Sequence, residues 1–309
     1  MNVTDLSFGI VMLLQFSIGI SVNIFLLLFY TRMVSTSQKI SSSDMILTQL
    51  ALANAVILLT SGIPETMSAW GWRNFLNNVG CKILVYLGRV ARGLAICTTC
   101  LLSIFQAITI SPGTSRWARV KAKLPKWILP SSVLSWAFNL LIDVNSLVFV
   151  TGPQNGSAVR MVLDLKYCIK VIDSAETTLL ITVVLSLREV FFVGLMSAAS
   201  GYMVLILHRH HRRVQHLHGQ SHSPRAMPEV RAAKKVIALV TLYVLLYGRQ
   251  TIMLSILLNV KEKSPVFMSS HMMLSFTFSV ISPFLMIHSD RRMRTFWKRE
   301  SPAVGTDPS

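Results

Sequence analysis

Seven long apolar runs constrain the fold of this chain more than any other feature. A helix needs about 20 mostly apolar residues to cross a bilayer. Seven stretches have roughly that length or more: residues 8–30, 45–63, 83–110, 127–150, 179–207, 230–258 and 266–288. The sequence shows no soluble domain and no internal repeat. It therefore predicts one all-α membrane domain over residues 1–309, a bundle of seven transmembrane helices.

The overall composition favours membrane embedding. Of the 309 residues, 52% are hydrophobic and only 14% are charged, whereas soluble chains carry about a quarter charged residues. The formal net charge of +17 would suit a nucleic-acid-binding protein, but such proteins gather Lys and Arg on a soluble domain. Here the basic residues lie between apolar runs. We therefore expect a lipid bilayer around the chain and no nucleic-acid partner.

The basic residues also predict which segments face the cytoplasm. The segment after the third run has five bases and no acid: Arg116, Arg119, Lys121, Lys123 and Lys126. The segment after the fifth run, which we interpret as a cationic loop beginning at His208, is basic too, as is the tail after the seventh run. The alternate segments mix acids and bases. Glu65 is one of these acids, after Pro64 at the expected end of the second helix. We predict an amino terminus outside and a carboxyl terminus inside.

Two of the four cysteines lie in segments that this topology places outside. Cys81 is at the outer end of the third helix and Cys168 is in the second outer segment. An oxidising face lets them form a disulfide bond, and two free thiols are the alternative. Asn155 begins an Asn-Gly-Ser triplet in the same outer segment and fits an N-glycosylation acceptor.

Charged residues inside the runs are the candidate ligand-binding residues, because a charge in a bilayer is costly and normally faces the bundle interior. They all fall in the outer halves of the expected helices: Arg89, Arg92, Asp143, Arg188, Glu189 and Arg249. Two interpretations remain open. The residues form a polar pocket for an anionic or hydrogen-bonding ligand, or they form ion pairs that only hold the helices together.

Enzymatic chemistry finds little support in the sequence. We find no Gly-rich phosphate loop, no His-Glu-x-x-His motif and no cysteine pair at zinc spacing. The histidines between residues 208 and 218 alternate with arginines, which repel a metal cation, so this stretch fits a solvated basic face better than a metal site. We expect no enzyme activity, no cofactor and no metal. A transporter would be expected to show a paired repeat of broken helices, and none is visible.

Several longer motifs resemble those of the vomeronasal type 1 receptors, a family of G-protein-coupled receptors. They include Leu50-Ala51-Leu52-Ala53-Asn54, Phe105-Gln106-Ala107-Ile108-Thr109-Ile110-Ser111-Pro112, Ser223-Pro224-Arg225-Ala226-Met227-Pro228-Glu229, Tyr243-Val244-Leu245-Leu246-Tyr247-Gly248-Arg249-Gln250-Thr251 and Ser282-Pro283-Phe284. The resemblance covers nearly the whole chain. Like that family, the chain has no Asp-Arg-Tyr at the inner end of the third helix, so an Arg-based activation switch is not expected.

The resemblance implies a pheromone receptor in the plasma membrane of vomeronasal sensory neurons, acting through an inhibitory-type heterotrimeric G protein. We hypothesise that a small pheromone-like ligand binds near Arg92, Glu189 and Arg249. The candidate G-protein contacts are Arg212, Arg213, Arg231 and Lys234. A bitter-taste-type receptor is the alternative, and a membrane transporter fits less well.

Overall fold

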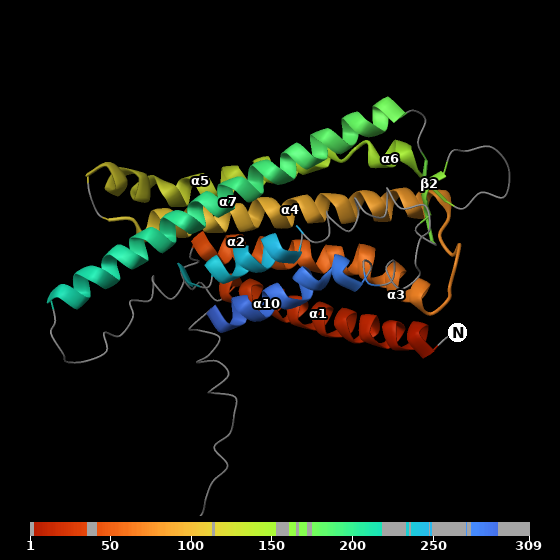
Figure 1. The fold of residues 1–309 in the computed structure, drawn as a ribbon, viewed down its shortest axis with the longest axis horizontal. Helices are drawn as coiled ribbons and strands as arrows, with labels where there is room; N and C mark the ends of the chain where they lie inside the picture. The colour runs from red at the N-terminus through yellow and green to blue at the C-terminus, as the bar shows by residue number, and fades with distance from the viewer. Residues whose placement is uncertain are drawn as a thin grey trace, which may run out of the picture.

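The computed structural model describes residues 3–35, 42–112, 115–152, 161–164, 167–171, 175–217, 233–234, 236–246, 248, 270 and 273–289. Its elements are α1 (Val3–Ser35), α2 (Ser42–Ile57), the π-helical turn η1 (Leu58–Gly62), α3 (Ile63–Ala69), α4 (Asn78–Ile110), α5 (Ser115–Ile142), α6 (Ser146–Phe149), the strands β1 (Val150–Thr151), β2 (Met161–Asp164) and β3 (Ile169–Val171), α7 (Ala175–Leu217) and α10 (Thr277–Ser289). The long helices run lengthwise through the molecule, with the strands at one end (Figure 1).

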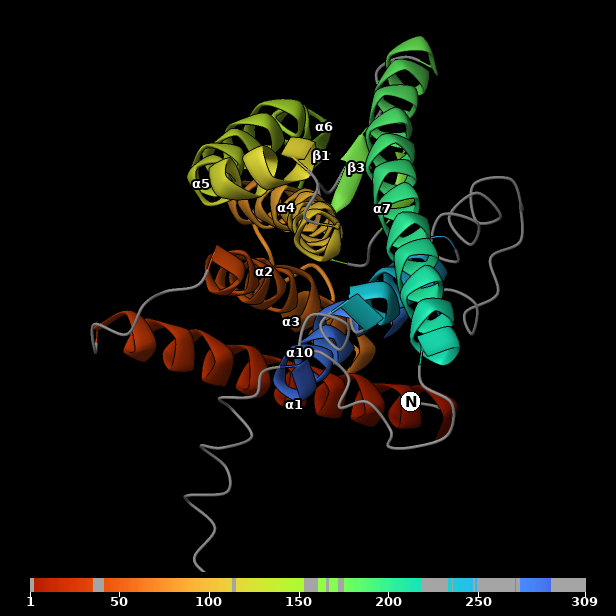
Figure 2. The ribbon, with the colours of Figure 1, turned by 90° about the vertical axis from the view of Figure 1, so that its left-hand side faces the viewer.

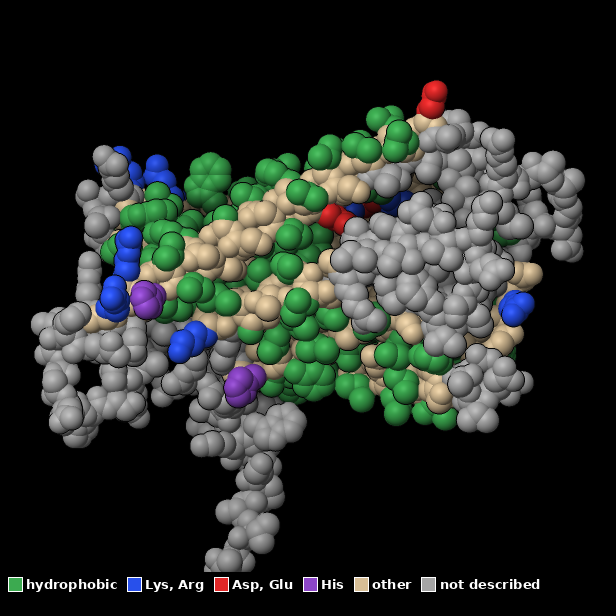
Figure 3. Space-filling model, viewed as in Figure 1, with side chains coloured by type: hydrophobic (Ala, Val, Ile, Leu, Met, Phe, Trp, Pro, Cys, Tyr) green, Lys and Arg blue, Asp and Glu red, His purple; other side chains and the backbone are tan. Residues whose placement is uncertain are grey.

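The helical segments follow the expected spans in order. Within the described residues, five helices are long and apolar enough to cross a membrane, and shorter apolar helices cover Val236–Leu246 and Met273–His288. Figure 3 shows apolar side chains spread over one broad face of the molecule. Exposed apolar surface on this scale marks contact with lipid or with a partner. The all-α membrane fold is therefore confirmed, and the orientation of the termini stays a prediction.

Helix α4 is the central element of the bundle. It packs against α2, α5 and α7, while α1 packs against α2, α3 and α10. The end-on view in Figure 2 shows α4 with α5 on one side and α2 and α7 on others. Small buried residues such as Ala91 and Ala95 line α4, and small side chains let neighbouring helix backbones approach closely in a membrane. This central position explains why α4 carries most of the polar contacts described below.

The second expected span is longer than predicted. Its helix does not end before Pro64, because α2 continues through the π-helical turn η1 into α3, with the proline in the first turn of α3. A proline fits the first turn of a helix because its missing N–H would have no partner there. Glu65 therefore lies inside a helical span and is buried, so its assignment to an outer connecting segment was wrong.

Much of each basic segment that we interpreted as a loop is helical. Helix α5 starts at Ser115, which makes residues 115–126 helical, and α7 continues through His208 to Leu217. Lys, Arg, Ala and Leu are good helix formers. A positive charge is costly in the hydrocarbon layer, but it does not prevent a residue from being helical. At its other end α5 stops at Ile142, so Asp143 lies in the turn before α6.

A small antiparallel sheet closes the end of the bundle that carries the disulfide bond, which we call the outer end. Its strand order is β1-β3-β2. Val150 pairs with Lys170 and Thr151 with Ile169. The sheet brings the segment around Cys168 to the start of α4, since β1 and α4 are in contact.

Candidate functional site

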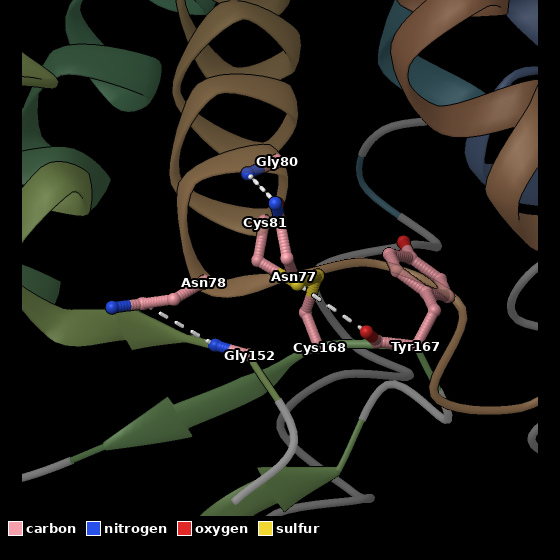
Figure 4. The surroundings of a disulfide bond; sticks show 7 residues. All are labelled: Asn77, Asn78, Gly80, Cys81, Gly152, Tyr167 and Cys168. Atoms are coloured by element: carbon pink, nitrogen blue, oxygen red, sulfur yellow. Dashed lines mark hydrogen bonds between the residues drawn. A yellow bond between two sulfur atoms is a disulfide. The ribbon is translucent and has the colours of Figure 1, made fainter.

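The disulfide bond between Cys81 and Cys168 is present and fixes the outer end of α4 (Figure 4). Asn77 caps this helix, because its side-chain oxygen accepts a hydrogen bond of 2.7 Å from the Gly80 N–H. The Gly152 N–H donates to the side chain of Asn78 at 3.4 Å. A Cβ at position 152 would lie 2.7 Å from the Asn78 backbone nitrogen. The close approach of the β1 segment to α4 therefore requires glycine.

Tyr167 lies beside the disulfide bond and points into the protein. Its backbone oxygen is 3.3 Å from the Cys81 sulfur, a close contact rather than a hydrogen bond, since an oxidised sulfur carries no proton. The ring is buried and packs against Phe75. Burial raises the pKa of the Tyr167 phenol above its usual value, and the nearby carboxylate of Glu65 adds to this rise. The phenol is therefore a neutral group at physiological pH.

A first group of polar and charged residues joins α4, α5 and α7, and we name it the Asp143 cluster: Arg89, Asn139, Asp143 and Arg188. The Arg188 Nη1 donates to Asp143 Oδ2 at 2.8 Å. The Arg89 Nε lies 3.3 Å from Asp143 Oδ1, an ion pair without hydrogen-bond alignment. Asp143 is fully buried, and the Arg188 side chain is only 6% exposed. Two guanidinium groups on one buried carboxylate stabilise its charge, and removal of that carboxylate would leave both cations unpaired.

Asn139 completes the Asp143 cluster from α5. Its Oδ1 accepts a bond of 3.4 Å from Arg188 Nη1. Its amide nitrogen donates to the Ser135 carbonyl at 2.7 Å and to Cys97 Sγ at 3.4 Å. The side chain fits only because position 93 on α4 is glycine, where a Cβ would overlap Asn139 Oδ1. Asn139 thus holds Arg188 in the orientation that pairs it with Asp143.

A second group, the Glu65 cluster, contains Glu65, Arg92, Tyr167 and Ser275. The Ser275 hydroxyl donates to Glu65 Oε2 at 2.7 Å and so connects α3 to the helical residues 273–275 before α10. Arg92 interacts electrostatically with both Glu65 and Tyr167. Its Nε is buried, and within the described part of the chain it has no hydrogen-bond partner. Arg188 Nε is likewise buried without a described partner, but the Nη1 of that residue binds Asp143. Arg92 differs in that no described carboxylate lies within ion-pair distance of it.

The predicted site residues divide between these clusters. The structure joins Arg89 and Arg188 through Asp143. Half-buried Glu189 interacts electrostatically with Arg89. Arg92 belongs to the Glu65 cluster. Arg249, Arg231 and Asn155 lie outside the described residues, as does the side chain of Arg213, while Arg212 and Lys234 are exposed.

The sequence did not single out four of the residues in these clusters: Glu65, Asn139, Tyr167 and Ser275. Glu65 was missed because Pro64 was interpreted as a helix end. A signal for it existed, since proline is tolerated in the first turn of a helix. The other three are uncharged, and their roles depend on which helices become neighbours. Whether any of these residues contacts a ligand stays a prediction.

Comparison with known proteins places these features in a family. The family model for the vomeronasal organ pheromone receptor family matches residues 6–299. The chain is 36% identical over 288 residues to the Homo sapiens protein "Vomeronasal type-1 receptor 4", covering 92% of this chain and 96% of that protein. It is 35% identical over 287 residues to the Danio rerio protein "Olfactory receptor class A-like protein 1", covering 93% and 90% respectively.

A solved structure has the same fold. Squid rhodopsin superposes with a TM-score of 0.74 at 16% sequence identity, over 97% of this chain and 85% of that one. At this identity the likeness establishes the seven-helix architecture only. The match across residues 6–299 establishes more, and the chain belongs to the vomeronasal organ pheromone receptor family.

Proposed function

We propose that this multi-pass chemosensory G-protein-coupled receptor detects a small pheromone-like molecule in the outer half of its bundle. In this proposal it acts in the plasma membrane of vomeronasal sensory neurons and signals through an inhibitory-type heterotrimeric G protein. The family membership supports a receptor with a ligand and a G-protein partner. The ligand class, the type of G protein and the cell type are the parts that we add.

Arg92 differs from Arg89 and Arg188 in its ion pairing, and this difference is the main support for the ligand proposal. Arg89 and Arg188 already share the carboxylate of Asp143, so they fit the role of ion pairs that hold the helices together. Arg188 and Arg92 each have a buried Nε without a described acceptor, but only Arg92 also has no described carboxylate within ion-pair distance. A buried donor without a partner is costly, and a ligand that brings an acceptor would remove that cost. Arg92 is thus the arginine that we assign to the ligand.

At the opposite, inner end of the bundle, we propose contacts with the G protein. Arg212 and Lys234 are exposed, and they would contact an acidic or carbonyl-rich surface of the G protein once the inner ends of the helices separate. Ligand binding would shift the population toward that separated arrangement, because it favours the state in which the ligand has its full set of contacts.

The test uses the full receptor in cells, with a panel of urinary and steroid-like volatiles as probes and nucleotide exchange on defined G proteins as the readout. We expect exchange on the inhibitory type and not on the stimulatory type. Arg92→Gln should raise the half-maximal concentration of an active probe at least tenfold at unchanged surface level. Arg73→Gln, which removes an exposed charge outside the span, is the matched control. An unchanged response in Arg92→Gln would refute the assignment of Arg92.

A further inference from the structure

The first turns of α5 have two different faces, and neither has a role in the proposed ligand site. On one face, Lys121 is partly buried and its Nζ donates to the Ser111 carbonyl at the end of α4, at 2.6 Å. Trp117 packs near Tyr202 of α7 on that inward side, with ring centroids 6.1 Å apart. These contacts fix the rotation of α5 about its axis, because they direct Lys121 and Trp117 toward the bundle.

The other face carries a row of exposed cations, which we name the α5 basic stripe: Arg119, Lys123 and Lys126. Their spacing of four and three residues places them on one side of a helix. The row is about 10 Å long at 1.5 Å per residue. Helix α5 contains no Asp or Glu, and no described carboxylate pairs with the stripe, since the ion pairs found in the described residues both involve Asp143.

The stripe lies next to the part of α5 that the bilayer covers. Trp127 follows it directly and is 63% exposed, and beyond it Leu129, Val133 and Leu134 are exposed apolar residues. Exposed tryptophan is typical of the membrane–water interface. The stripe therefore begins within one residue of that level and extends away from the hydrocarbon, where phosphate groups of lipids lie.

We propose that the α5 basic stripe is a binding site for a membrane lipid whose headgroup carries several phosphates, as phosphoinositides do. Clusters of Lys and Arg immediately next to a transmembrane helix attract such lipids. A headgroup with one negative charge can pair with only one of the three cations at a time. A multiply phosphorylated headgroup can engage several cations of the 10 Å row together, and Arg119 can bind a phosphate with two parallel hydrogen bonds. Occupancy would hold the first turns of α5 at the membrane surface.

The test measures lipid binding to the purified full-length receptor in nanodiscs. One set contains neutral lipid with phosphatidylinositol bisphosphate, and another contains phosphatidylserine at the same total charge. A soluble inositol phosphate serves as the competitor. We expect preferential retention of the bisphosphate lipid by the wild-type receptor, and weak competition by the soluble headgroup. The triple variant Arg119→Gln, Lys123→Gln, Lys126→Gln should weaken retention by about two orders of magnitude, since each cation near the surface contributes roughly a factor of five or more.

Lys121→Gln is the matched control, because it removes one charge from the same helix but from the opposite face. It should retain the bisphosphate lipid as the wild type does. Equal retention of the two lipids, retention by the triple variant, or a loss in Lys121→Gln as large as in the triple variant would each overturn the proposal. If the triple variant does not fold, Lys123→Glu alone replaces it, with Lys123→Arg as the variant that must keep binding.

Discussion

Replacing Gly93 by alanine should damage the Asp143 cluster, although alanine is the better helix former. Exchanging glycine for alanine inside a helix stabilises it by about 0.5–1 kcal/mol where there is space. At position 93 there is none. A Cβ would overlap Asn139 Oδ1, lie 2.8 Å from Asn139 Cγ and lie 3.1 Å from Arg188 Nη1. Asn139 is fully buried, so its amide has no free volume to move into.

The expected cost exceeds the helix-propensity gain. Displacement of Asn139 weakens its bonds to Arg188, Cys97 and Ser135, and each such bond contributes about 0.5–1.5 kcal/mol. Forcing an additional carbon into a packed core costs a further 1–3 kcal/mol, roughly. After the gain is subtracted, we expect a net loss of about 3 kcal/mol in the free energy of unfolding. This corresponds to a fall in Tm of about 5–10 °C.

The assay is thermal unfolding of the purified receptor with a thiol-reactive dye, because the free thiols Cys97 and Cys100 are both buried in the folded protein. Gly194→Ala is the matched control, since nothing lies within 4 Å of a Cβ at position 194 in the same bundle. It should leave Tm unchanged or raise it slightly. Adding Asn139→Ala to Gly93→Ala should cost less than the sum of the two single changes. If Gly93→Ala melts like Gly194→Ala, the close approach of Asn139 to α4 is refuted.

Two further predictions concern the two ends of the contact between α4 and α7. Asp143→Asn should destabilise the receptor by about 3–5 kcal/mol, because two guanidinium groups lose their buried carboxylate. Arg89→Gln should cost less, since the Arg89 side chain is 22% exposed and Arg188 stays paired. The same dye-based melting experiment measures both, and equal losses would contradict the ranking. Tyr202→Phe removes the 3.0 Å hydrogen bond between the hydroxyls of Tyr202 and Ser111, worth about 1 kcal/mol. It should raise ligand-independent nucleotide exchange about fivefold, and unchanged basal exchange would show that this bond does not restrain activation.

Apolar length predicted the helical fold, but the sequence did not reveal how far each helix extends. The reason is that hydropathy reports where hydrocarbon ends, not where hydrogen-bonded helix ends. Residues 208–217 are mostly polar, yet they continue α7. Glu65 was placed outside its span for a related reason. Pro64 was interpreted as a helix end, whereas the chain continues as helix through the π-helical turn η1 into α3.

The candidate site was predictable in its charged residues but not in their pairing. Arg89 and Arg92 lie one turn apart on α4, and nothing in their spacing indicates that they have different partners. The difference comes from the elements around them. The turn after α5 brings Asp143 to Arg89, while α3 brings Glu65 near Arg92. These partners are 54 and 27 residues apart in sequence, so only the packing of the bundle defines them.

The contacts between α4 and α7 suggest how the two ends of the receptor influence each other. Both helices are continuous over their described lengths, and neither contains proline, so each moves as a nearly rigid rod. Near the outer end they are joined through Asp143, which pairs Arg89 with Arg188. Near the inner end they are joined by the bond between Ser111 and Tyr202. Because rods held at two points cannot rotate against each other without breaking a contact, a ligand that displaces α4 through Arg92 must strain one of these two connections. The inner one is the weaker, since it is a single bond between neutral hydroxyls, and so we expect it to break first.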